Sequence, residues 1–205
     1  FPRNFNAPYV AVSFSDFWRR WHISLSTWLR DYLYISLGGN RHGKWKTRRN
    51  LLITMLLGGL WHGARWNFVL WGALHGLLLS LEQLVFGKKT NERPQALILD
   101  FGRTLLMFLL VTLIWVPFFS PEISTTMGIY RSMTLNWTPI ILSDLYGHLP
   151  IFAICFGILF SQYLRVRKIL PKRSSMWFRI LATILMIYSI LHYRGGSIDF
   201  IYFQF

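Results

Sequence analysis

Apolar runs separated by short basic clusters make up the later part of the chain. Residues 98–119, 146–164 and 177–193 carry few charges. The length of each range is close to the about 20 residues that an apolar helix needs to cross a bilayer. We therefore predict a transmembrane helix over each range. The polar segment 121–139 is predicted to be a turn-rich outer loop, and the densest basic cluster, residues 165–173, a cytoplasmic loop, because Lys and Arg favour that side.

A different pattern covers residues 14–34, where apolar side chains recur every three or four positions. The opposite face carries Arg19, Arg20 and Arg30, which would be costly at the centre of a bilayer. We predict one amphipathic helix over this range that lies in the membrane interface, with Ser15 and Asp16 at its N-cap. The apolar stripe consists of Phe14, Phe17, Trp18, Trp21, Leu25, Trp28 and Leu29.

A basic loop then leads into residues 50–81, which are apolar except for His62, Arg65 and His75. Glycines interrupt this run near its middle, and basic clusters lie on both sides of it. The pattern predicts a helical hairpin over residues 50–86 that enters the membrane from the cytoplasm and returns, with His62 at its deep tip. Roughly 37 residues folded in half give arms of about 27 Å, close to the hydrocarbon thickness.

Composition narrows the classes of function. Of the 205 residues 53% are hydrophobic and only 15% charged, so a soluble fold could not bury the apolar runs. The net charge of +14 lies in separate clusters between those runs, which argues against nucleic acid and for a lipid bilayer as partner. We predict an all-α, polytopic transmembrane protein with interfacial and re-entrant helices. The chain begins without Met or a signal-peptide pattern, so we expect a fragment.

The histidines are the side chains best suited to chemistry. His62, beside Trp61 at the glycine break, either acts as a base or caps a helix end by a hydrogen bond. A neutral imidazole between apolar walls can take a proton from a hydroxyl, because burial disfavours its charged form. His22 is either a packed interfacial side chain or a second functional residue, and His75 either packs or lines the same cavity.

Other chemistries find less support in the sequence. Cys155 is the single cysteine, so no disulfide framework forms, and the histidines lack the spacing of zinc motifs. We therefore expect no metal site. The chain has no GxSxG motif for a nucleophilic serine, and Gly38-Gly39 alone is too short for a phosphate-binding loop.

Two motifs resemble the membrane-bound O-acyltransferase (MBOAT) family, and within it the bacterial alginate O-acetyltransferase branch. They are the run from Ser15 to Ser26 (SDFWRRWHISLS) and the run from Gly59 to Ala64 (GLWHGA). Residues 30–35 (RDYLYI), 37–41 (LGGNR) and 200–205 (FIYFQF) also fit this branch. The resemblance is dense over residues 1–81, weak through the middle, and returns at the C-terminus. It implies that residues 1–205 are the C-terminal part of one membrane domain.

The resemblance also implies an activity and a site. The family's catalytic histidine matches His62, and a second polar residue about forty positions earlier matches His22. The donor is expected to be acetyl-CoA or another cytoplasmic acyl thioester, with no tightly bound cofactor. The acceptor is expected to be an exported polysaccharide, reached with a periplasmic or extracellular acetyl-accepting partner protein, and the location the cell inner membrane.

Two alternatives stay open. A related branch of the family transfers D-alanine from a carrier protein toward teichoic acid, and the basic loops suit either donor. A noncatalytic membrane scaffold or channel, whose histidines pack or line an aqueous path, would tolerate replacement of His62.

Overall fold

The computed structural model describes residues 3–86, 97–135 and 142–169, and these ranges contain helices and no strand. The predicted all-α fold class is confirmed. The chain divides into two compact units, residues 1–138 and 139–205. In the second unit, α7 (Leu142–Val166) covers the predicted span 146–164. The predicted span 177–193 lies outside the described residues.

In place of one helix over residues 14–34, the structure has three shorter pieces. They are α1 (Phe14–Arg20), α2 (Ile23–Trp28) and η2 (Leu29–Tyr34), the last a π-helix. The N-cap of α1 is Ser13, whose side chain accepts a hydrogen bond from the backbone N–H of Asp16, so the cap predicted at Ser15 and Asp16 is corrected. The break between α1 and α2 falls on Trp21 and His22.

The segment that precedes α1, which includes the 3₁₀ turn η1 (Pro8–Val10), supplies the physical reason for this break. The backbone N–H of Ile23 donates to the carbonyl of Asn4 at 2.9 Å, and that of Asn6 donates to the carbonyl of Arg20 at 2.9 Å. The Asn4 carboxamide oxygen also accepts from the backbone N–H of Ser24 at 3.0 Å. Backbone groups freed by the break are thereby satisfied from outside the helix.

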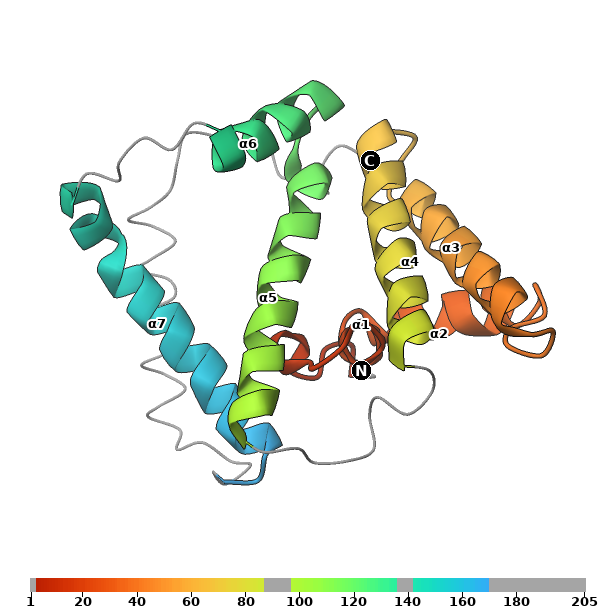
Figure 1. The fold of residues 1–205 in the computed structure, drawn as a ribbon, viewed down its shortest axis with the longest axis horizontal. Coiled ribbons are helices and arrows are strands. Elements are labelled where there is room, and N and C mark those ends of the chain that lie inside the picture. Colours follow the sequence, from red (N-terminus) through yellow and green to blue (C-terminus); the bar gives the residue numbers. More distant parts are fainter. Residues whose placement is uncertain (1–2, 87–96, 136–141, 170–205) are drawn as a thin grey trace. The chain divides into compact units, whose positions relative to one another are not determined.

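Helices α3 (Lys44–Trp61) and α4 (Trp66–Phe86) form a hairpin and lie side by side (Figure 1). The hairpin begins at Lys44, so residues that we expected in a basic loop are helical, consistent with the high helix propensity of Lys and Arg. Two glycines let the backbones touch. A Cβ on Gly59 would overlap the carbonyl of Phe68, and one on Gly72 would overlap the carbonyl of Met55.

Helix α5 (Leu97–Phe119) packs on the other side of α4 (Figure 1) and occupies the predicted span 98–119. The Asn67 side-chain amide donates to the carbonyl of Ser120 at 2.7 Å and ties the start of α4 to the end of α5. The turn-rich loop predicted over 121–139 is wrong for residues 123–135, which form α6 (Ile123–Leu135). The Tyr130 hydroxyl donates to the carbonyl of Leu113 and holds α6 against α5.

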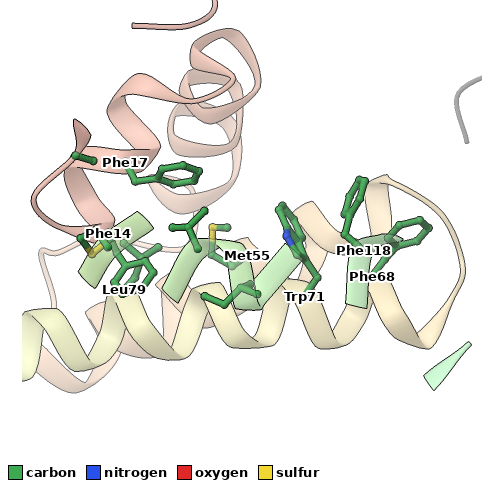
Figure 2. Close-up of a cluster of buried hydrophobic side chains, with 11 residues drawn as sticks. Phe14, Phe17, Met55, Phe68, Trp71, Leu79 and Phe118 are labelled. Atoms are coloured by element: carbon green, nitrogen blue, oxygen red, sulfur yellow. The ribbon is translucent and has the colours of Figure 1, made fainter. Parts of the chain in front are cut away.

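Two helical segments among the described residues are long and apolar enough to cross a membrane, Trp66–Phe86 and Leu99–Phe119. Between these helices and α1 lies the buried core of the first unit. Figure 2 shows its side chains spaced along α4, with Phe68 and Phe118 together at one end and Leu79 and Phe14 at the other. The core therefore joins α1, α3, α4 and α5.

Candidate active site

His62 lies in the turn that joins α3 to α4. It is the C-cap of α3, and the next residue, Gly63, has a φ of 143°, which favours glycine. The imidazole is half-buried and meets three aromatic rings almost at right angles. The ring centroids lie 4.9 Å from Trp61, 5.5 Å from Trp71 and 5.0 Å from Phe118.

These walls come from different elements. Trp61 ends α3, Trp71 lies in the second turn of α4, and Phe118 lies near the end of α5. Phe68 adds a fourth ring at 6.2 Å from His62. The imidazole thus occupies an apolar aromatic enclosure with one part of its surface still accessible.

His22 lies at the break between α1 and α2, in the left-handed conformation with φ 43° and ψ 55°. This conformation is uncommon for a residue with a Cβ, and it persists only where surrounding contacts impose it. The Asn4 and Asn6 hydrogen bonds on either side of the break supply those contacts. The His22 ring packs near Phe5 and near Trp61, with centroid separations of 6.3 and 6.5 Å.

The structure brings the two predicted site histidines together. Both rings contact Trp61, with centroid separations of 6.5 Å for His22 and 4.9 Å for His62. The Nδ1 atom of His22 is buried and has no hydrogen-bond partner among the described residues. Desolvation lowers the pKa of His22 below its ordinary value of 6.5, so its neutral form is favoured.

Two carboxylates hold α1, and with it His22, in place. Asp16 pairs with Arg20 at 2.9 Å within α1. Glu82 of α4 is buried, and its carboxylate accepts from the backbone N–H groups of Phe14 and Ser15 at 2.6 and 3.2 Å. The first turn of α1 is therefore capped by a carboxylate from α4. A negative charge is favourable there, because the N-terminus of a helix carries a partial positive charge.

Sequence reasoning missed Glu82 and the Trp71 and Phe118 walls. An acidic residue at the end of an apolar run was a usable signal for Glu82, because such a charge requires partners. No local signal marks Phe118 as a neighbour of His62, since the two belong to separate helices.

His75 does not join the other two histidines directly. It is fully buried in α4, and its ring contacts Trp18 and Trp71 at 5.0 and 4.8 Å. Phe14 and Phe17 lie against it at 6.4 and 6.1 Å. Trp71 is thus the shared wall between His75 and His62.

A cavity of about 490 Å³ opens nearby, among α1, α2, η2 and the α3–α4 hairpin, but neither His22 nor His62 lines it. Its walls include Trp18, Met55 and Leu79, with Arg19 and Arg30 among the polar residues. Within the described residues, no three His, Cys, Asp or Glu side chains gather into a possible metal site.

A neutral imidazole in an apolar enclosure is suited to proton transfer with a hydroxyl. The model of the membrane-bound O-acyltransferase family matches residues 1–110, which include every side chain of the site except Phe118 near the end of α5. The chain belongs to the MBOAT family. This confirms the resemblance seen in the two histidine motifs and makes the chain part of a membrane protein.

Several MBOAT relatives are similar to the chain. It is 50% identical to the probable alginate O-acetylase AlgI of Azotobacter vinelandii over 147 residues, 71% of the chain and 28% of the relative. The peptidoglycan O-acetyltransferase of Helicobacter pylori is 41% identical over 64% of the chain and 25% of that protein. The teichoic acid D-alanyltransferase of Bacillus subtilis is 31% identical over 45% of the chain and 25% of that protein. The chain thus spans about a quarter of the length of these relatives.

Proposed function

We propose that His62 is the general base of a membrane O-acyltransferase that moves an acetyl group from a cytoplasmic thioester toward a hydroxyl of an exported polysaccharide. The observation that carries this proposal is the aromatic enclosure of His62, to which His22 is joined through Trp61. Membership of the MBOAT family supports the acyl-transfer class.

The reaction assigns a simple task to His62. Its basic nitrogen takes the proton of the acceptor hydroxyl as the oxygen attacks the thioester carbonyl carbon. A C–O bond forms and the C–S bond breaks, and the proton then passes from His62 to the departing thiolate. No covalent bond to the protein is needed, and the donor supplies both the acetyl group and the leaving thiol.

His22 is proposed to position a reacting group or hold it by a hydrogen bond. Its buried Nδ1 atom lacks a partner in the described chain, and its position is fixed by the constrained break before α2. A neutral His22 can donate a hydrogen bond to a developing oxyanion or accept one from the acceptor hydroxyl.

Alginate is the favoured acceptor, because the similarity to AlgI of Azotobacter vinelandii is 50% identity over most of the chain. We further propose an inner-membrane, multi-pass location, and a periplasmic partner that receives the acetyl group. Peptidoglycan is the second candidate acceptor, supported by 41% identity to the Helicobacter pylori enzyme. The 31% identity to a teichoic acid D-alanyltransferase covers less of the chain and makes D-alanyl transfer a weaker alternative.

The test is the acetyl content of exported polysaccharide in cells that carry the full-length protein with His62→Ala. We expect acetylation to be lost while the abundance of the protein in the membrane equals that of wild type. His42→Ala is a matched control, because His42 is exposed and away from the site. Normal acetylation in the His62→Ala cells would contradict the proposal and support the scaffold or channel alternative.

A further inference from the structure

Four buried polar atoms without partners gather behind the candidate active site. Both ring nitrogens of His75 and the indole Nε1 atoms of Trp18 and Trp71 have no hydrogen-bond partner among the described residues. The three rings touch one another, with centroid separations of 5.0, 4.8 and 5.8 Å. His75 itself is 0% exposed.

Such a cluster is unusual, because each buried polar group left unpaired costs roughly 1–3 kcal/mol. Each indole can only donate, and a neutral imidazole has one donor and one acceptor. The indole nitrogens therefore cannot satisfy each other. A water molecule supplies a partner to three of these four atoms, since it can accept from both indoles and donate to the bare nitrogen of His75.

The position of this cluster gives it a consequence for His62. The indole ring of Trp71 contacts both histidines. Its centroid lies 4.8 Å from that of His75 and 5.5 Å from that of His62, and its plane is nearly perpendicular to the His62 ring. A hydrogen bond to the Trp71 indole fixes the tilt of that ring. Because interiors are close-packed, a change in the tilt moves the imidazole that rests against it.

The cluster also lies next to an open cavity. Trp18 lines the cavity of about 490 Å³ among α1, α2 and the hairpin, and it contacts His75 at 5.0 Å. A water molecule held behind Trp18 therefore lies close to an open space from which it can enter.

We propose that Trp18, Trp71 and His75 bind one buried water molecule, and that His75 is thereby a positioning residue which holds Trp71 against the base His62. The second half of this inference rests on the proposed function of His62. His75 touches no substrate in this arrangement and acts only through the Trp71 ring.

Activity of the full-length protein tests the positioning role, with His75→Phe, His75→Gln and the exposed-site control His42→Phe. His75→Phe keeps a ring but removes both nitrogens, and we expect kcat to fall by roughly 10- to 100-fold with KM changed less than about twofold. His75→Gln keeps a donor and an acceptor and should recover most of the rate. Unchanged kcat in His75→Phe overturns the positioning role.

Thermal unfolding of the same variants tests the water site without any activity. If the cluster is dry, His75→Phe removes an unpaired polar group and should raise the Tm. If it holds water, the change removes the hydrogen bond between His75 and that water and should lower the Tm. A raised or unchanged Tm overturns the water site. So does an experimental map of the full-length protein that resolves ordered water and shows none between Trp18, Trp71 and His75.

The outcomes for the two histidines are separable. An active His62→Ala variant contradicts the proposed base and leaves the Tm result for His75 to be judged alone. An inactive His62→Ala variant beside a fully active His75→Phe variant contradicts only the positioning role.

Discussion

At the scale of single residues, His22 shows how a backbone break can serve a site. Its left-handed conformation turns the chain between two helices and places the ring against Trp61. Asn4, in the preceding segment, stabilises that turn by accepting hydrogen bonds from the backbone N–H groups of Ile23 and Ser24. The residue pattern alone predicted a continuous helix through this point, because apolar spacing does not record hydrogen bonds from a distant segment.

The lowered pKa of His22 predicts a pH dependence of stability. Desolvation holds the folded-state pKa below 6.5, so the unfolded chain binds a proton on His22 more readily than the folded chain does. Stability attributable to this residue is therefore complete well above pH 6.5 and is lost as the pH falls through that value. We expect His22→Asn to show a smaller drop in Tm than wild type between pH 7.5 and 5.5, with His42→Asn as the control. An equal drop in wild type and His22→Asn would contradict this.

At the scale of elements, the α3–α4 hairpin is the part of the site in which two backbones pack in direct contact. Gly59 and Gly72 allow backbone contact between its arms, and Gly76 brings α4 close to Leu52 in the same way. The hairpin could be predicted from the sequence, since its glycine break and apolar arms are local signals. The Phe118 wall of His62 could not be predicted, because Phe118 reaches the site only through the packing of α5 on α4.

Substitution at these glycines tests the close contact. Gly59→Ala places a methyl group on the carbonyl of Phe68 beside His62, and we expect a loss of about 1–3 kcal/mol of stability with reduced acetyl transfer. Gly102→Ala in α5 is the matched control, because a Cβ there meets nothing within 4 Å and alanine favours a helix. Thermal unfolding in detergent compares the two, and equal Tm values would show that the arms separate without cost.

At the scale of the whole molecule, the apolar segments and basic clusters set a topology. The segments Trp66–Phe86 and Leu99–Phe119 are long enough to span, and the basic residues 165–173 are predicted to stay in the cytoplasm. Helical content and family were predictable because both depend on local composition and motifs. The helix at residues 123–135 was not, because its turn-forming Ser, Thr and Gly residues favour a loop until α5 packs against it.

Cys155 as the single cysteine makes this topology testable. In a Cys155→Ser background, a cysteine placed at Lys168 should resist a membrane-impermeant thiol reagent in intact cells and react after permeabilisation. A cysteine at the exposed Glu122, in the segment predicted to face outward, is the comparison and should react without permeabilisation. Labelling of Lys168→Cys in intact cells would contradict the predicted cytoplasmic location of residues 165–173.

The Glu82 carboxylate caps α1 although Glu82 lies 68 positions after Phe14 in the sequence, and this separation has a consequence for biosynthesis. A ribosome synthesises the chain from its N-terminus, so His22 emerges well before Glu82, the residue whose carboxylate caps α1. The aromatic wall at Phe118 is made later still. The parts of the candidate site are therefore translated well before they can meet, and the site cannot assemble in a nascent chain until α4 and α5 have both been made.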